Sequence, residues 1–253
     1  MWKSKTRGDI TMKVVYLYHS GMAFELEHCI LMVDYYQPEA VTAVLQPQVR
    51  RLLGCGKPVY VLVSHVHADH FDPVVLNWQQ EGEVHYVFSA DVAPALQGRE
   101  AQVHFLKKGE VFQDENLTVK AYGSTDVGIS FYIQTEGWKL FHAGDLNNWH
   151  WNEESTEEEI RQSEQEYQNE LTLIAQEIKG LDVLCFPVDS RLGHDYMRGA
   201  EQFVSAVPVR WFVPIHFTSG RPEDPLAFGP VARKYGASFW CAAHECDSVI
   251  LEK

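Results

Sequence analysis

The chain has 253 residues with 45% hydrophobic and 12% aromatic content, enough for one large packed domain or two small ones. Its formal charge of −14 and lack of a basic patch argue against nucleic acid as a partner, because a polyanion would be repelled. No run approaches the roughly 20 apolar residues of a membrane helix, and the N-terminus lacks the apolar segment of a signal peptide. Five scattered cysteines without a C-x-x-C pair suit the reduced cytosol, so we expect a cytoplasmic protein with no membrane segment.

The first third of the chain predicts strands and turns, then one helix and another strand. The expected helix spans 38–53 and ends at Gly54, with Pro47 kinking it or splitting it in two. A buried strand follows at 59–64, and Asp72-Pro73 opens the next helix with an N-cap and a proline at its first position. The earlier strands are expected at 14–17, 23–26 and 30–34.

The middle of the chain again predicts strands, with a hairpin turn at Glu136-Gly137, and then a long helix over about 156–179 with one apolar stripe. The last third alternates strands with helices. Nothing resembles a linker or a repeat, so we expect a single domain over 1–253 built of stacked sheets and flanking helices. The expected strands are 85–88, 103–106, 117–122, 129–135, 138–141, 183–188, 209–215, 238–241 and 248–251, and the late helices are 197–207 and 230–235.

The segment 65–70 gathers four metal-ligand side chains directly after the buried strand 59–64. Imidazole and carboxylate suit zinc and similar divalent ions. His65 and His67 project to the same side of an extended chain, whereas Asp69 and His70 follow as the chain turns and approach from another angle. The segment therefore predicts two adjacent metal sites.

Two further ligands are expected where later strands end. Asp145 follows the strand 138–141 and lies just past Gly144, which allows a close backbone approach, so its carboxylate could bridge two metals. His216 lies at the end of the apolar strand 209–215. Strand ends of α/β sheets are common places for such sites.

This order of motifs resembles the metallo-β-lactamase-fold hydrolase superfamily, over nearly the whole chain. Within it, the phrases 17–21 (Leu-Tyr-His-Ser-Gly) and 142–145 (His-Ala-Gly-Asp) most resemble the subgroup that includes ascorbate-6-phosphate lactonase. The resemblance implies an α/β (α+β) fold, a four-layer αβ/βα sandwich with the metals at one edge of two packed sheets. It also implies Zn²⁺ as cofactor, as one or two divalent ions, with Mn²⁺ or Fe as alternatives.

One position departs from the family pattern. The family supplies a further metal-binding histidine, often within Gly-His-Thr-x-x-Gly, and here Ser124 stands in its place within 123–128. A serine hydroxyl is a much poorer zinc ligand than imidazole. Either the site of His65 and His67 loses affinity, or catalysis has been lost, or another group replaces the histidine. The candidates for that replacement are His19, Asp126, His150 and His194.

The resemblance implies metal-activated water that attacks an ester-type bond of a small molecule, such as a lactone, ester, thioester or phosphodiester. Asp69 is the expected group to orient the water, and His194 the expected proton donor to the leaving group, with His150 or solvent as alternatives. A metal-binding scaffold or sensor is the main alternative. An iron redox protein is another, although we expect no attached flavin-type domain, which argues against the best-known version.

Two segments near the expected site offer substrate contacts. Trp149 and Trp151 could wall a pocket, or merely cover the core where the long helix begins. Arg191 could hold an anionic substrate group, although a structural ion pair with Asp189 explains it equally well. The sequence carries no signal for an oligomeric state.

Overall fold

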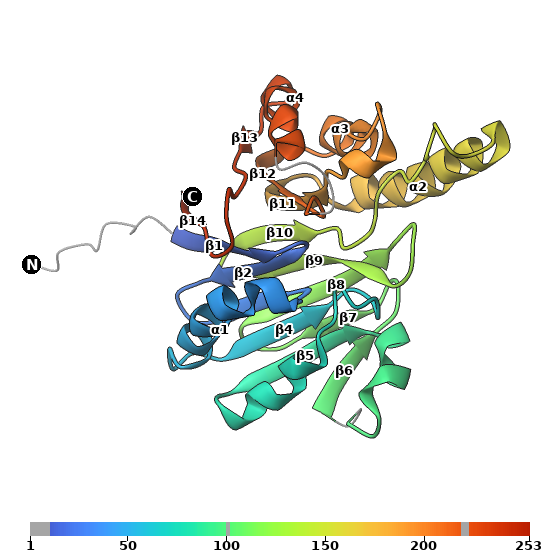
Figure 1. Cartoon of the computed structure of the whole chain (residues 1–253). Coiled ribbons are helices and arrows are strands. Elements are labelled where there is room, and N and C mark those ends of the chain that lie inside the picture. The colour runs from blue at the N-terminus through green and yellow to red at the C-terminus, as the bar shows by residue number, and fades with distance from the viewer. Residues whose placement is uncertain (1–10, 100–101, 219–222) are drawn as a thin grey trace, which may run out of the picture.

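Two sheets of seven strands each lie at the centre of the molecule (Figure 1). The computed structural model describes residues 11–99, 102–218 and 223–253. In spatial order the first sheet contains β14 (Ser248–Glu252), β1 (Thr11–Tyr18), β2 (Gly21–Glu25), β3 (Ile30–Val33), β4 (Val59–Val63), β5 (Val84–Ser89) and β6 (Val103–Leu106). The second contains β13 (Ser238–Phe239), β12 (Val209–Ile215), β11 (Leu181–Pro187), β10 (Trp138–His142), β9 (Ile129–Thr135), β8 (Leu117–Gly123) and β7 (Val111–Gln113).

Helices cover the outer faces of both sheets (Figure 1). The first sheet packs against α1 (Glu39–Leu53) and the 3₁₀ helices η1 (Pro73–Gln80) and η2 (Ala90–Leu96). The second packs against α2 (Glu157–Glu177), α3 (Arg198–Ala206) and α4 (Phe228–Lys234). The short helices η4 (Ser190–Leu192) and η5 (Asp224–Ala227) lie in connections. A third apolar cluster fills the space between the sheets, so the expected four-layer order is confirmed.

The alternation of side chains along each strand produces these layers. In β4, Val59, Val61 and Val63 pack under α1, whereas Tyr60 and Leu62 face the second sheet. Successive side chains point to opposite faces of a strand, so a strand buried on both faces reads as a continuous apolar run.

Most expected elements are present, with a few differences. Helix α1 runs through Pro47 as one helix and is not split. The helix after Asp72 is a 3₁₀ helix, and the Asp72 carboxylate caps it by accepting a hydrogen bond from the Val74 amide at 2.9 Å. The hairpin at 136–137 is confirmed, with positive φ at both residues. Strand β7 and helix η2 were not expected, because short elements carry little periodic signal.

The strand directions determine where the polar residues gather. β3 to β6 run parallel in the first sheet, as do β10 to β13 in the second. The carboxyl ends of parallel neighbours lie at the same edge of a sheet, so the residues that follow β4, β10 and β12 come close together. Among the described residues, no helix is both long enough and apolar enough to cross a membrane.

Candidate metal centre

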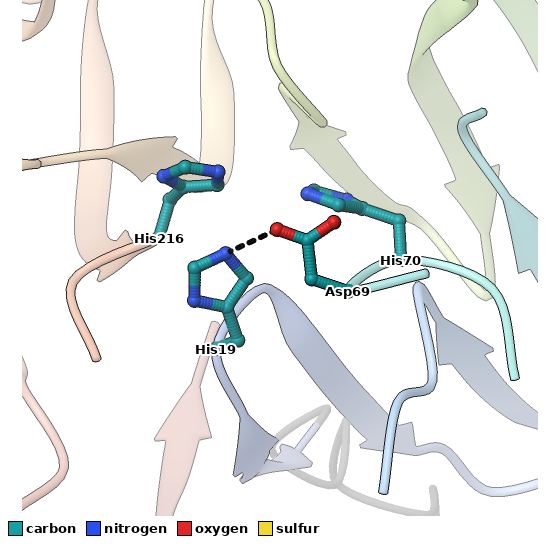
Figure 2. A group of neighbouring side chains, drawn as sticks. All are labelled: His19, Asp69, His70 and His216. Carbon is teal, nitrogen blue, oxygen red and sulfur yellow. Dashed lines mark ion pairs between the residues drawn. The ribbon is translucent and has the colours of Figure 1, made fainter. Parts of the chain in front are cut away.

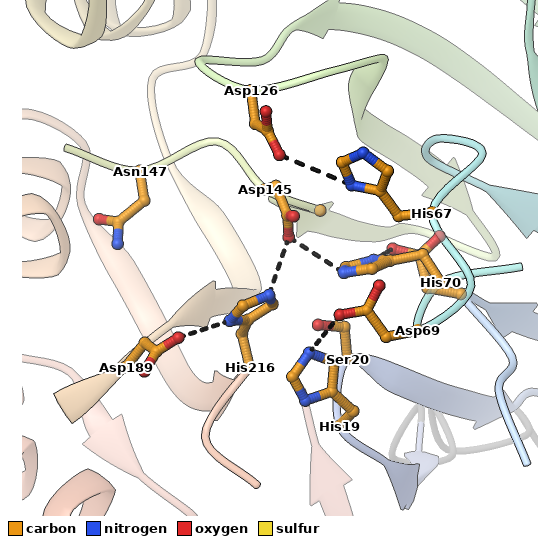
Figure 3. Close-up of polar contacts among 12 residues, drawn as sticks. His19, Ser20, His67, Asp69, His70, Asp126, Asp145, Asn147, Asp189 and His216 are labelled. Carbon is orange, nitrogen blue, oxygen red and sulfur yellow. Dashed lines mark hydrogen bonds and ion pairs between the residues drawn. The ribbon is translucent and has the colours of Figure 1, made fainter. Parts of the chain in front are cut away.

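The histidines and carboxylates expected to bind metal meet at one edge of the two sheets (Figures 2 and 3). They come from five separate places in the chain. These are His19 after β1, the segment 65–70 after β4, Asp126 between β8 and β9, Asp145 after β10 and His216 after β12.

One set, here called the three-histidine group, consists of His19, Asp69, His70 and His216 (Figure 2). Each residue offers one ligand atom, and these atoms all lie within 4.8 Å of one another. His19 Nε2 lies 3.3 Å from Asp69 Oδ2, and the three imidazoles are buried.

A second set, the two-histidine group, consists of His65, His67, Asp126 and Asp145 and has the same compactness. His65 Nε2 lies 3.4 Å from Asp145 Oδ2, and His67 Nδ1 lies 3.7 Å from Asp126 Oδ2. Of the four candidates for the missing family histidine, Asp126 thus lies beside His65 and His67, and His19 lies in the other group.

The Asp145 carboxylate lies between the two groups (Figure 3). Its Oδ1 is 3.1 Å from His70 Nε2 and 3.4 Å from His216 Nε2, while its Oδ2 faces His65. This geometry suits the predicted bridging role.

The residues present fit divalent metal ions. His19 Nε2, His65 Nε2, His70 Nε2 and Asp145 Oδ1 are buried without a hydrogen bond within the described part of the chain. A buried polar atom without a hydrogen bond costs about 1–3 kcal/mol. A cation in each group would compensate such atoms, and imidazole with carboxylate is a donor set suited to divalent ions.

Outer contacts orient the imidazoles. The second ring nitrogen of His70 lies 2.9 Å from Asp34, that of His216 3.0 Å from Asp189, and that of His19 2.6 Å from the Thr218 hydroxyl. Such contacts fix the tautomer that leaves the other nitrogen free for a metal. Asp34 and Thr218 were not predicted from the sequence, although Asp34 carries the same signal as Asp145, a carboxylate at the end of an apolar strand.

Backbone strain is concentrated at these positions. His19, Asp34 and His216 have φ values of 54°, 50° and 59°, in the left-handed region that non-glycine residues rarely adopt. Each such residue costs about 1–3 kcal/mol, and strain of this kind clusters at functional sites.

The pKa values of the three-histidine group reflect its dense charge. Burial opposes the charged form of His70, but the Asp145 and Asp34 carboxylates outweigh burial and raise its pKa to about 10. Burial lowers the pKa of His19. The close contact with His19 Nε2, 3.3 Å away, holds the pKa of Asp69 well below its usual range. Without a metal, the carboxylates are ionised and His70 carries a proton.

The other expected histidines lie elsewhere. The His194 side chain is 95% exposed and pairs with Glu153, and it does not line the cavity beside the two groups. His150 is buried, and both of its ring nitrogens are used, by the Asp195 carbonyl and the Asn152 amide. Neither is placed to replace a ligand or to reach the cavity.

Ser124 has a structural role in the loop that carries Asp126. Its hydroxyl accepts a hydrogen bond from the Asp126 amide at 3.2 Å. Thr125 fixes the same loop, because its hydroxyl contacts the backbone of Asn147. The position of the expected histidine therefore forms a turn, and the carboxylate two residues later reaches the site.

A cavity of about 330 Å³ opens beside both groups. Trp149 and Trp151 form part of its wall, with their rings stacked 6.4 Å apart. The Trp149 indole donates to the Asp145 carbonyl at 2.7 Å and packs edge-on against His216. Arg191 also lines the cavity and forms the ion pair with Asp189, and its contact with an anionic substrate group stays a prediction.

Comparisons with known proteins agree with this architecture. A family model for the beta-lactamase superfamily domain matches residues 32–217. A UPF0173 metal-dependent hydrolase from Alkaliphilus metalliredigens is 25% identical over 148 residues, 53% of this chain and 63% of that protein, so the chain covers less than two thirds of its length.

Two solved structures show the same fold. One is the metallo-β-lactamase fold protein YhfI from Bacillus subtilis, with a TM-score of 0.65, 14% identity, and coverage of 96% of this chain and 100% of that chain. The other is Igni18, a metallo hydrolase from Ignicoccus hospitalis, with a TM-score of 0.64, 16% identity, and coverage of 96% and 99%. The expected metallo-β-lactamase fold is therefore confirmed.

Metal binding should release protons. A metal ion needs the neutral imidazole of His70, which is protonated below its pKa of about 10 in the metal-free protein. Affinity for the first ion should rise about tenfold per pH unit between about pH 6.5 and 8.5, with about one proton released from His70. Calorimetry in two buffers of different ionisation enthalpy measures both quantities. An affinity that does not change with pH would contradict this protonation state.

Proposed function

Because the chain belongs to the beta-lactamase superfamily, we propose that it is a metal-dependent hydrolase that cleaves an ester-type bond of a small molecule. The observation that carries this proposal is the pair of His/Asp groups that share Asp145 and face one cavity. Two divalent ions held there would lower the pKa of a water molecule and polarise the electrophilic oxygen of the substrate. Zinc fits the imidazole-rich donor set, as the sequence resemblance also implies.

Asp69 is placed to orient the attacking water. Its carboxylate is half-exposed on the cavity wall, and its lowered pKa keeps it ionised at neutral pH. An ionised carboxylate can accept a hydrogen bond from water and point the oxygen lone pair at the substrate. The histidines that line the cavity, His67 and His216, both belong to the metal groups. Solvent is therefore our proposed proton source for the leaving group.

The cavity wall favours a substrate with an anionic group. Arg191 is the only cation among the described residues that line the cavity, and Asp189 holds its Nε at 3.0 and 2.9 Å. The same Asp189 carboxylate holds His216, so an anion at Arg191 would lie in a fixed relation to the metals. The stacked Trp149 and Trp151 offer a flat apolar surface beside it. A lactone or other ester with an anionic substituent fits these contacts.

The metal dependence is tested with Asp145→Ala and His216→Ala. Each variant removes a side chain that contacts other ligand residues and also lines the cavity. Bound metal and hydrolysis should therefore be lost together. We expect activity to fall at least about 100-fold. Metal content is measured by mass spectrometry, and activity on a panel of lactones, esters, thioesters and phosphodiesters.

His28→Ala, a change at an exposed histidine away from the site, is the matched control and should retain both metal and activity. Full metal content in either site variant would contradict the assignment of the ligands. Tight metal binding without hydrolysis across the whole panel would instead favour a metal-binding scaffold or sensor.

The substrate class is tested with Arg191→Gln on two esters that differ in charge, 4-nitrophenyl acetate and mono(4-nitrophenyl) glutarate. Loss of the guanidinium should raise KM about tenfold for the glutarate ester and leave the acetate ester nearly unchanged. Arg198→Gln, outside the cavity, is the control. Metal content must be checked for each variant, because Asp189 also contacts His216. Equal effects on both esters would rule out an anion site at Arg191.

A further inference from the structure

We infer that the two ligand groups form unequal metal sites. The three-histidine group binds its ion first and more tightly. The two-histidine group, through Asp126, is the exchangeable site and the one that accepts harder ions such as Mn²⁺ or Fe²⁺. This inference rests on the proposed metal centre but not on the hydrolysis that we propose for it.

The donor atoms of the two groups differ. The three-histidine group offers three imidazoles and one carboxylate, with Asp145 beside them, whereas the two-histidine group offers two imidazoles and two carboxylates. Imidazole favours zinc, and carboxylate oxygen favours Mn²⁺ and similar hard ions. Discrimination of Zn²⁺ over Mn²⁺ should therefore be weaker at the two-histidine group.

The partners of the second ring nitrogens also favour tighter binding by the three-histidine group. Every imidazole of the three-histidine group has a partner on its second nitrogen, and for His70 and His216 that partner is a carboxylate. A carboxylate partner makes an imidazole a better donor, and outer partners of this kind are worth about 10–100-fold in metal affinity. In the two-histidine group, the second ring nitrogen of His65 contacts the Ser64 hydroxyl and not a carboxylate, and the His67 ring has no hydrogen bond among the described residues.

Exposure separates the groups further. In the two-histidine group the His67 and Asp126 side chains are 46% and 45% exposed, whereas in the three-histidine group only Asp69 is exposed, at 46%, and the three imidazoles are buried. Asp126 is held by a short loop, in which its amide donates a hydrogen bond to the Ser124 hydroxyl, and its carboxylate contacts the group only through His67 at 3.7 Å. A metal ion held by exposed side chains exchanges more readily, because water competes for the ion. The exposed side chains also lose rotamer freedom when they bind it, which weakens binding.

Asp145 links the loading of the two sites. Its Oδ1 faces His70 and His216, and its Oδ2 faces His65. Asp145 would thus serve both sites with one carboxylate. A second ion would bind next to an existing positive charge and share that carboxylate, which would weaken its binding further.

The test is stepwise loading of the metal-free full chain with Zn²⁺ and with Mn²⁺, followed by calorimetry and by metal analysis after gel filtration. We expect two Zn²⁺ ions whose dissociation constants differ at least about 100-fold. When the protein is offered one equivalent of each metal, Mn²⁺ should occupy the weaker site and give a bound-Mn²⁺ electron paramagnetic resonance signal.

Two variants assign the weaker site. Asp126→Asn should retain only the tight ion and lose bound Mn²⁺. Asp126→His should restore a third imidazole, raise Zn²⁺ affinity at the weaker site at least about tenfold and reduce Mn²⁺ retention. Asp195→Asn, outside the cavity, is the matched control and should behave as the unaltered chain.

Equal dissociation constants, or two tight ions in Asp126→Asn, would overturn the inference. An Asp126→His variant with unchanged selectivity between Zn²⁺ and Mn²⁺ would overturn it too. Failure of the unaltered chain to bind any ion would overturn the metal centre itself. Unequal binding without hydrolysis of any substrate would support the inference and refute only the hydrolase activity.

Discussion

The charge of Asp145 is the constraint on which the site depends. This carboxylate is buried, and a buried charge is costly unless opposite charge compensates it. Three imidazole nitrogens face it within 3.4 Å, two from the segment 65–70 and one from His216. Gly144 permits its position, since φ is 53° there and a Cβ atom would lie 2.8 Å from the Ser64 side chain. In the metal-free protein a proton on His70 provides compensation, and a divalent ion provides it more fully.

The packing of the sheets supplies the rigidity that this arrangement needs. Asp34 at the end of β3 accepts hydrogen bonds from the Ser64 amide and hydroxyl and contacts His70, so it ties two neighbouring strand ends together. His19 and His216 are joined by a backbone hydrogen bond of 3.2 Å across the two sheets, and both have strained φ values. The apolar layers around the strands hold these residues in conformations that they would not adopt alone.

Much of the fold and the site follows from local patterns. The strands were predictable because apolar runs and turn residues mark them directly, and the segment 65–70 with Asp145 and His216 needed only the rule that polar residues at strand ends converge. Asp126 could only be named as one of four candidates. Which of the four candidates reaches His65 and His67 depends on the loop 123–128. The course of that loop is determined by the Ser124 hydroxyl and by Gly128, with φ of 79°.

Contacts between distant segments carry no such local signal. Thr218 reaches His19 because the two sheets bring them together, and Asp34 reaches His70 because β3 and β4 are neighbours in the first sheet. The position of His194 at a strand end suggested a catalytic role, but the loop after β11 turns it to solvent. A position at a strand end therefore predicts that a residue lies near the site edge of a sheet. The conformation of the following loop determines whether its side chain points into the site.

The most direct test is a crystal structure of the protein purified without chelators, with anomalous scattering recorded at the zinc and manganese edges. The account predicts two metal peaks, one on each side of the Asp145 carboxylate, each about 2.1 Å from its histidine nitrogens. One peak should contact His19, His70 and His216, and the other His65, His67 and Asp126. A single peak, or an Asp126 side chain turned away from the metal, would contradict it.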